Sequence, residues 1–293
     1  VPLRRADPER LRDLVDRFAG ERHPASSPAA LERAQQRVAA GLEAAGCRVR
    51  WRPFEHRGRT RHNVVGHRGE DRSGPAVLVG AHADTVAGTP GADDNASGLA
   101  VLLEVARLLS PSDGSLSVPL EFVCFDLEEP QGTTYAVGSD HYARQARDEG
   151  REYRACLVLE MVGYTDPEPG SQSVPPLLFW KDVPDAGTFL AAVGDWRSRG
   201  LVDEYCRSAR SAAPELPVVG FRSPFRGWLV PPTRLSDHCR FWDRGYPALM
   251  LTDTAFLRNP HYHGPGDRPE TLDYGFMALV AEVTAAAVRS LAR

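Results

Sequence analysis

Short apolar runs alternate with long helical patterns through most of this chain, and this alternation constrains its fold more than any other feature. Runs typical of buried strands occupy residues 76–81, 120–125, 155–159, 176–179 and 248–251. Apolar residues at helical spacing occupy residues 97–109, 139–147, 186–212 and 271–291. Short apolar strands separated by helices form a largely parallel sheet whose faces the helices cover. The sequence therefore predicts an α/β fold, a three-layer sandwich with a mixed, largely parallel central sheet covered by helices.

The N-terminal part of the chain adds two helices and two strands to this pattern. Apolar residues spaced i, i+3, i+4 predict helices over residues 8–18 and 28–45. Strands are expected over residues 47–54 and 61–66, and only a polar turn separates the second from the run at 76–81, so we expect those two strands to be neighbours. Because no repeat or linker divides the 293 residues, we expect a single domain over residues 1–293.

Composition excludes several classes of protein. Basic and acidic side chains number 35 and 39, and no dense basic stripe is interleaved with aromatic residues, so we expect no nucleic-acid partner. No run of about 18 apolar residues is present, so we expect no membrane span. A cytoplasmic location is favoured, and secretion after removal of a leader stays open because the chain begins at Val1. The scattered cysteines indicate neither a disulfide framework nor a zinc knuckle: Cys47, Cys124, Cys156, Cys206 and Cys239.

Residue types that bind metals follow the apolar runs. In an open parallel sheet the ligand site lies beyond the carboxyl ends of the strands. The first run ends in Ala81-His82-Ala83-Asp84. Residues two apart on an extended chain point to the same face, so the Asp84 carboxylate can lie beside His82 and orient its imidazole. This is the usual environment of a metal-bound histidine, although an isolated pair of this kind is a weak signal.

A polar turn precedes the helical pattern at 97–109. It reads Gly-Ala-Asp-Asp-Asn-Ala-Ser-Gly over residues 91–98 and holds Asp93 and Asp94. The alternative to a metal site is a helix cap, since Asp and Asn accept hydrogen bonds from the first N–H groups of a helix. Capping needs only one such side chain, whereas this turn has three, so capping alone explains it poorly.

Adjacent carboxylates, Glu128 and Glu129, follow the run at 120–125. Both can face one site only if the chain turns here, and Pro130 with Gly132 favours such a turn. Two like charges held together raise one pKa, which suits a general base that takes a proton and returns it. The alternative is a solvated pair at a strand end.

Two further segments complete the pattern. Glu160 closes the run at 155–159, and His261-Tyr262-His263 lies between the last run and the C-terminal helical pattern; taken alone, this triplet could be a surface loop. Together, two histidines and three carboxylates give the ligand count of a two-metal site bridged by one carboxylate: His82, Asp94, Glu129, Glu160 and His263. Nitrogen and oxygen ligands without thiolate suit zinc, with cobalt or manganese as substitutes. Such a pair of ions activates a water and polarises a carbonyl.

These blocks, in this order and spacing, resemble the M28 family of zinc-dependent aminopeptidases. The matching strings are Gly80-Ala-His-Ala-Asp-Thr-Val, the turn at 91–98, Glu128-Glu129, Leu159-Glu160-Met-Val-Gly, and Tyr262-His263 with Asp267. The resemblance covers roughly residues 10–290. It implies a zinc exopeptidase-like fold, a peptide substrate, release of N-terminal residues and two zinc ions per chain.

The resemblance also implies a role for each matching residue. Asp94 would bridge the two ions, with His82 and Glu160 completing one and Glu129 and His263 the other. Glu128 would be the general base and acid, Asp84 would orient His82, and Tyr262 would donate a hydrogen bond to the tetrahedral oxyanion. Many relatives carry Asp in place of Glu160.

Other features leave alternatives open. Tyr135 lies in a segment longer than the family's usual turn and could reach the pocket. The shape of the pocket depends on the long loops that carry Trp180, Phe221, Phe225 and Trp228. The segment Ser236-Asp237-His238 could line the cleft, although a helix cap is the favoured interpretation. A glutaminyl-cyclase-like enzyme with one zinc, or a noncatalytic binding protein, would use the same scaffold. Carboxypeptidase or dipeptidase action also stays open, and the sequence predicts no oligomeric state.

Overall fold

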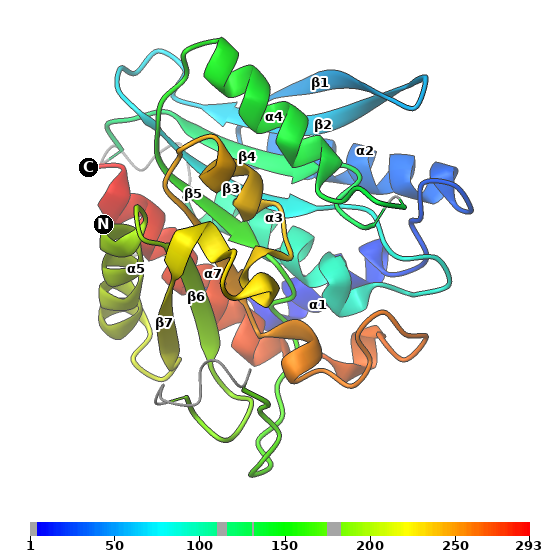
Figure 1. Cartoon of the computed structure of the whole chain (residues 1–293), viewed down its shortest axis with the longest axis vertical. Coiled ribbons are helices and arrows are strands. Elements are labelled where there is room, and N and C mark those ends of the chain that lie inside the picture. Colours follow the sequence, from blue (N-terminus) through cyan, green and yellow to red (C-terminus); the bar gives the residue numbers. More distant parts are fainter. Residues whose placement is uncertain (1–4, 110–115, 131, 175–182) are drawn as a thin grey trace.

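The computed structural model describes residues 5–109, 116–130, 132–174 and 183–293. One eight-stranded sheet crosses the protein in the order β1-β2-β4-β3-β5-β8-β6-β7 (Figure 1). Its strands are β1 (Arg48–His56), β2 (Arg59–Arg68), β3 (Ala76–His82), β4 (Leu120–Phe125), β5 (Tyr153–Leu159), β6 (Leu190–Asp195), β7 (Val218–Ser223) and β8 (Ala248–Thr252). The described helices of at least six α-helical residues are α1 (Pro8–Phe18), α2 (Pro28–Ala44), α3 (Gly98–Leu108), α4 (Val137–Asp148), α5 (Arg199–Ala212), α6 (His238–Asp243) and α7 (Tyr274–Leu291).

The helices cover both faces of the sheet. Apolar residues of α1, α2, α3, α5 and α7 form one large core cluster with one face. Tyr142 of α4 and Phe241 and Trp242 of α6 belong to a second cluster on the other face, which also holds Phe125 of β4. In Figure 1, α4 and the short helix α6 lie in front of the sheet and α7 lies behind it. This arrangement confirms the predicted three-layer sandwich.

The sheet is mixed, also as predicted. Four adjacent strands run parallel to one another, in the order β4-β3-β5-β8. Strand β6 also runs parallel to β7. The pairs β1–β2, β2–β4 and β6–β8 are antiparallel. The expectation that the strands at 61–66 and 76–81 are neighbours is wrong, because β2 pairs with β4, where Val64 lies opposite Cys124. Helix α3 provides the crossover that parallel strands need, and it places β4 between β3 and β2.

The prediction of a helix over residues 186–212 is wrong for the first half of that range. Strand β6 occupies this part and is buried along its whole length, and α5 begins only at Arg199. The run Leu-Ala-Ala-Val has the composition of a helix, but pairing with β7 and β8 on both sides overrides that propensity. Strand β7 was also not predicted. The strand expected over residues 176–179 lies outside the described residues.

By length and composition alone, α7 could cross a membrane, and the sequence analysis did not single it out. Its 18 residues have a mean hydropathy of 1.3, and 67% of this window is buried inside the protein. Val280, Val283 and Val288 belong to the larger core cluster, together with residues of α3 and α5. The apolar character of α7 therefore matches its burial against neighbouring helices.

Candidate metal centre

The candidate site lies where parallel strands end together. His82 is the last residue of β3, and Glu160 directly follows the neighbouring strand β5. Glu128 and Glu129 follow β4, on the other side of β3. Because parallel strands end at the same edge of the sheet, an imidazole and three carboxylates lie close together there. All four side chains are buried.

The turn that carries Asp94 is fixed by two other side chains. The Asp267 carboxylate accepts hydrogen bonds from the backbone N–H groups of Asp93 at 2.7 Å and Asp94 at 3.1 Å. Asn95 connects the turn to β5, since its Nδ2 donates to the carbonyl of Leu159 at 2.9 Å. The polar residues around Asp94 therefore hold its main chain, which explains why the turn contains more of them than a helix cap needs.

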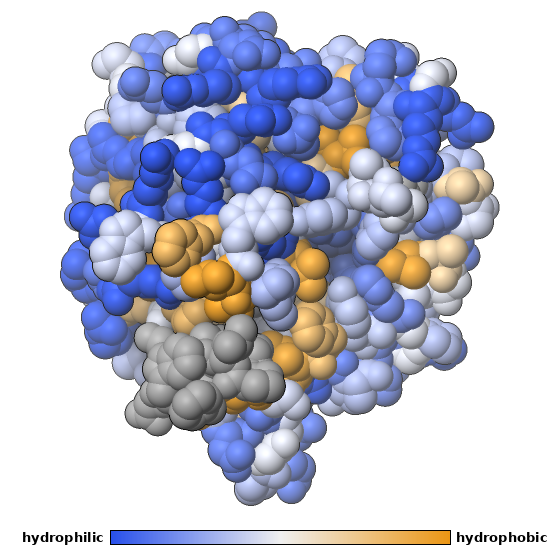
Figure 2. Space-filling view, viewed as in Figure 1, coloured by the Kyte–Doolittle hydropathy of each residue, from blue (hydrophilic) through white to orange (hydrophobic). Residues whose placement is uncertain are grey.

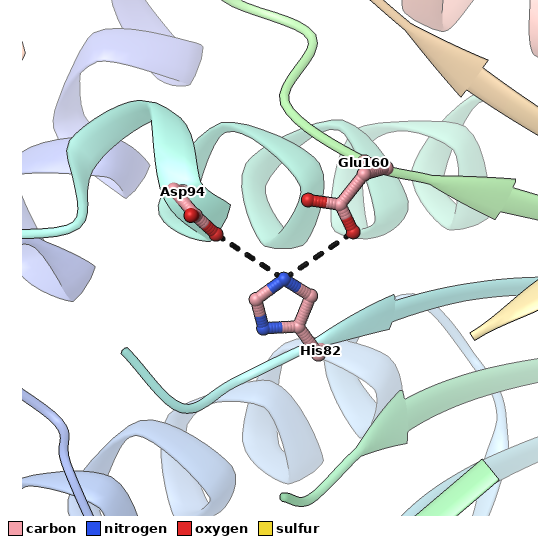
Figure 3. A group of neighbouring side chains, drawn as sticks. All are labelled: His82, Asp94 and Glu160. Atoms are coloured by element: carbon pink, nitrogen blue, oxygen red, sulfur yellow. Dashed lines mark ion pairs between the residues drawn. The ribbon is translucent and has the colours of Figure 1, made fainter. Parts of the chain in front are cut away.

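The first group of potential ligands consists of His82, Asp94 and Glu160 (Figure 3). Nε2 of His82 lies 3.3 Å from Oδ1 of Asp94 and 3.4 Å from Oε2 of Glu160. In Figure 3 the two carboxylates come from opposite sides toward the same ring nitrogen. Glu160 therefore reaches the group.

The second group shares Asp94 with the first. Its members are Asp94, Glu129 and His263. Nε2 of His263 lies 3.2 Å from Oδ2 of Asp94 and 3.4 Å from Oε2 of Glu129. The structure thus brings all five predicted ligands together, in the two groups that the family resemblance implies. Asp94 presents one carboxylate oxygen to each histidine.

These separations fit a metal ion in each group. Zinc ligands with bonds of about 2.0–2.2 Å in a tetrahedron lie about 3.3–3.6 Å apart, close to the 3.2–3.4 Å measured between the ligand atoms. Nε2 of His82 and Oδ1 of Asp94 are buried and make no hydrogen bond with a described residue. Buried polar atoms without hydrogen bonds are costly unless another partner, such as a cation, satisfies them.

Asp84 connects the β3 end to the Glu128–Glu129 turn. Its carboxylate accepts a hydrogen bond from the N–H of Glu128 at 2.9 Å and from the N–H of Glu129 at 3.1 Å. Nδ1 of His82 lies 3.6 Å from Oδ1 of Asp84 and 3.2 Å from the main-chain oxygen of the same residue. Asp84 therefore faces the far side of the His82 ring, as predicted, and also fixes the main chain of both glutamates.

Glu128 lies beside the two ligand groups without belonging to either. Its Oε2 is 3.9 Å from Nε2 of His82. Burial raises the pKa of Glu128 well above its usual range, and the nearby carboxylates of Glu160 and Glu129 raise it further, against the opposing effect of His82. A carboxyl group with a raised pKa can accept a proton and release it again near neutral pH.

The candidate ligands shift one another's pKa values. Although burial raises the pKa of Asp94, the neighbouring imidazoles of His263 and His82 lower it below its usual value overall. Burial alone would lower the pKa of His263, but Asp94 and Glu129 raise it to about 10. Burial, with the neighbouring Asp94, raises the pKa of Glu129 to about 8. The cluster offers carboxylate oxygens and imidazole nitrogens, the ligand types that suit zinc.

The aromatic residue Tyr262 covers the second group. Its ring stacks on His263, with the ring centroids 3.8 Å apart. Burial and the neighbouring carboxylates of Asp94 and Glu129 raise the pKa of Tyr262. The phenol therefore stays protonated and remains a hydrogen-bond donor at neutral pH.

Ser236 is a site residue that the favoured interpretation of the sequence missed. Its hydroxyl donates a hydrogen bond to Oε2 of Glu160 at 2.8 Å. The predicted helix cap is wrong, because Asp237, which precedes α6, makes no side-chain capping bond with the described residues. The signal was present in the sequence as the polar segment Ser236-Asp237-His238, which precedes the aromatic pair Phe241-Trp242 by a few residues. Tyr135 turns away toward α6, where its hydroxyl donates to the carbonyl of Arg234 at 3.3 Å.

An apolar pocket adjoins the ligand groups and shares Glu160 and Tyr262 with them. Strands β6, β7 and β8 contribute apolar side chains to its lining, among them Ala191, Val193, Phe221 and Met250. Figure 2 shows apolar residues gathered on this face of the molecule. Phe221 lines this pocket from β7 and not from a long loop as predicted, whereas Phe225 and Trp228 are exposed and are not among the lining residues. Trp180 lies outside the described residues.

The family of the chain follows from comparison with known proteins. The model of peptidase family M28 matches residues 63–288. This chain belongs to peptidase family M28. That assignment confirms the resemblance seen in the motifs. The chain is 35% identical over 291 residues to the uncharacterised protein YfbL of Escherichia coli, covering 95% of this chain and 87% of that one.

Curated relatives with a named activity are more distant. The chain is 27% identical over 234 residues to leucine aminopeptidase 1 of Fusarium vanettenii, covering 75% of this chain and 53% of the relative. A probable leucine aminopeptidase of Arthroderma otae is 26% identical over 219 residues, covering 71% and 51%. The chain thus spans about half the length of these leucine aminopeptidases.

Solved structures share the fold. The LapA aminopeptidase of Legionella pneumophila superposes with a TM-score of 0.76 at 18% identity, covering 98% of this chain and 70% of that chain. An aminopeptidase from Aneurinibacillus sp. strain AM-1 gives 0.73 at 16% identity and covers 99% and 95%. A glutaminyl cyclase of Porphyromonas gingivalis gives 0.74 at 20% identity and covers 97% and 98%. Fold similarity alone therefore does not separate a peptidase from a cyclase.

Proposed function

We propose that this chain is a zinc aminopeptidase that binds two zinc ions and releases apolar N-terminal residues from peptides. The observation that carries the proposal is the position of Asp94, whose Oδ1 lies 3.3 Å from Nε2 of His82 and whose Oδ2 lies 3.2 Å from Nε2 of His263. A carboxylate placed in this way suits a bridge between two ions. His82 and Glu160 would complete one zinc site, and Glu129 and His263 would complete the other.

The ions and the protein have separate tasks in this mechanism. Zinc bound here would acidify a water and polarise the scissile carbonyl. Glu128, which lies beside both groups, takes the proton of the attacking water on its carboxylate and delivers it to the leaving amine nitrogen. Its buried position supports this role, because burial raises its pKa well above the usual range. Asp84 holds the Glu128 main chain in place through the 2.9 Å hydrogen bond.

Tyr262 stabilises the charge that develops on the carbonyl oxygen. Its ring is fixed against His263, and its pKa is raised by burial, so its hydroxyl is a neutral donor beside the reacting carbonyl. A donor placed before the reaction stabilises an oxyanion more than the neutral carbonyl. Tyr262 also lines the apolar pocket, so the same side chain would border the bound first residue of the peptide.

The surroundings of the site support the substrate class. Five buried carboxyl groups meet at the strand ends: Asp84, Asp94, Glu128, Glu129 and Glu160. Their oxygen atoms can accept hydrogen bonds from a free, protonated α-amino group and would disfavour a C-terminal carboxylate. The adjoining pocket, lined by side chains such as Val193, Phe221 and Met250, suits an apolar first side chain. The names of the relatives, leucine aminopeptidases, agree with that preference.

A glutaminyl cyclase on the same scaffold is the alternative, and the presence of two ligand groups argues against it. A one-zinc enzyme needs one set of Asp, Glu and His ligands, which Asp94, Glu129 and His263 would supply. His82 and Glu160 form a second group with Asp94, and a one-zinc enzyme does not require this group. Zinc stoichiometry therefore separates the two proposals.

The test uses chelator-treated protein titrated with zinc. We expect two tightly bound zinc ions per chain and zinc-dependent hydrolysis of leucyl anilide. N-acetyl-leucyl anilide, which lacks the free amino group, is the matched control substrate and should not be cleaved. The His263→Ala variant should bind one zinc ion fewer. One zinc per chain, no anilide hydrolysis and cyclisation of an N-terminal glutaminyl peptide would overturn the proposal in favour of the cyclase.

A further inference from the structure

Arg22, in the connection between α1 and α2, is buried beneath the candidate metal centre. Only 1% of its surface is exposed. It precedes the region that matches the family model, which begins at residue 63. The guanidinium group donates hydrogen bonds to main-chain carbonyl groups at both ends of the segment between the first two candidate ligands. Nε donates to Ala83 at 2.7 Å, and Nη2 donates to Gly91 at 2.9 Å.

Both carbonyl groups belong to segments of the main chain that carry a candidate metal ligand. Ala83 directly follows His82, and Gly91 begins the turn that holds Asp94. The main-chain N–H of Arg22 also donates to the hydroxyl of Thr85 at 2.9 Å. One side chain therefore connects the main chain beside His82 to the main chain beside Asp94. The planar fork of arginine can bind several acceptors at once in fixed directions.

The packing around this connection leaves little freedom. Gly91 has a φ of +60°, and a Cβ atom there would lie 2.3 Å from Cγ2 of Thr85 and 3.0 Å from Nη2 of Arg22. On its other side, Nη1 of Arg22 donates to the carbonyl groups of Phe18 at 2.7 Å and Gly20 at 2.9 Å. The end of α1 thereby anchors the guanidinium group. A shift of Arg22 would move both ligand-bearing segments.

The charge of Arg22 also bears on the site. Burial lowers its pKa to about 10, against the opposing effects of Asp94, Asp267 and Asp84. Arg22 is therefore charged at neutral pH. A charged guanidinium group makes stronger hydrogen bonds to the carbonyl groups of Ala83 and Gly91 than a neutral donor would.

We propose that Arg22 is a positioning residue for the metal centre: it fixes the spacing of His82 and Asp94 by holding the main chain next to each. This inference rests on the zinc-binding part of the proposed function. It assigns a role in the site to the N-terminal segment, which contributes no ligand among the described residues.

Arg68 provides a matched control. It is also a buried arginine, 7% exposed, whose guanidinium group donates to main-chain carbonyl groups, those of Ala45 at 2.6 Å and Ala106 at 3.1 Å and that of Leu109. It lies at the end of β2, where these contacts join the ends of α2 and α3 rather than the ligand segments. Replacing either arginine removes several buried hydrogen bonds between a guanidinium group and main-chain carbonyl groups. The variants of both arginines should therefore lose thermal stability.

The experiment measures zinc affinity by competition with a chromophoric chelator for the wild type, Arg22→Met and Arg68→Met. We expect Arg22→Met to bind zinc about 10–100-fold more weakly, the effect typical of removing a group that orients ligands. Arg68→Met should lose stability and keep the wild-type zinc affinity. The absorption bands of bound cobalt should also change in Arg22→Met and not in Arg68→Met, because they report ligand geometry.

Each result has a defined meaning. Wild-type zinc affinity in Arg22→Met, or equal weakening in Arg68→Met, overturns the role of Arg22 and leaves the proposed function intact. If the wild type itself binds no zinc, the proposed function fails and this inference fails with it. If Arg22→Met does not fold, Thr85→Val decides, since it removes the acceptor of the Arg22 N–H and nearly keeps the side-chain shape. Weakened zinc binding in Thr85→Val supports the inference, and unchanged binding overturns it.

Discussion

The hydroxyl of Ser236 donates a hydrogen bond of 2.8 Å to Oε2 of Glu160, and both side chains are buried. The two residues are 76 positions apart in the chain. Because Oε2 of Glu160 also lies 3.4 Å from Nε2 of His82, the serine fixes a carboxylate of the first group of potential ligands. Partners that orient ligands in this way tune the affinity of a metal site.

Removal of this hydroxyl should weaken one zinc site. We expect Ser236→Ala to reduce the affinity for one of the two zinc ions by about tenfold, measured by zinc titration with a competing chelator. Ser198→Ala is the control, since Ser198 is equally buried and donates to Asp195 at 2.7 Å at a distance from the ligands. Zinc binding by Ser236→Ala that matches the wild type at both sites would show that Glu160 needs no support from Ser236.

Substrate preference should follow the volume of the apolar pocket. Ala191 of β6 lines this pocket, so Ala191→Leu fills part of the space that a leucyl side chain would occupy. We expect kcat/KM for leucyl anilide to fall at least about tenfold relative to alanyl anilide, since a few methylene groups in an apolar pocket change binding by about 1–3 kcal/mol each. Comparing two substrates on one variant cancels any general loss of activity. An unchanged ratio would place the first side chain elsewhere.

His238 should make the stability of the protein depend on pH. Burial lowers its pKa from 6.5 to about 3, and the charge of Arg234 acts in the same direction. The unfolded chain therefore binds a proton below pH 6.5 that the folded chain does not bind. The stabilisation is complete above pH 6.5 and is lost as the pH falls from 6.5 toward 3, by about 1.4 kcal/mol per pH unit.

The variant His238→Gln isolates this effect. Gln can still donate to the carbonyl of Thr233, which lies 2.9 Å from Nε2 of His238, and it does not titrate. Urea unfolding of both proteins between pH 4 and pH 7 should show the wild type losing stability relative to the variant as the pH falls. Parallel pH profiles would mean that His238 does not remain neutral in the folded protein.

The sequence predicted the parts of the site that depend on strand ends. Apolar runs mark β3 and β5 clearly, so the residues that follow them, His82 and Glu160, could be assigned to one edge of the sheet. Strand β6 was missed because its alanine-rich run has helical composition and becomes a strand only through its neighbours. Arg22 was missed, and a place in the cleft was not the favoured interpretation of Ser236, for a related reason. Their roles depend on contacts between distant segments, and local patterns do not encode such contacts.

The central claim is that Glu128 is the general base of a zinc peptidase, and Glu128→Gln tests it most directly. The substitution keeps the shape of the side chain and alters none of the five candidate ligands. Zinc content and leucyl anilide hydrolysis would be measured on the same preparations of wild type and variant. We predict unchanged zinc content and a kcat lower by about 10²–10⁴. Near-normal hydrolysis by a variant with the zinc content of the wild type would contradict the account.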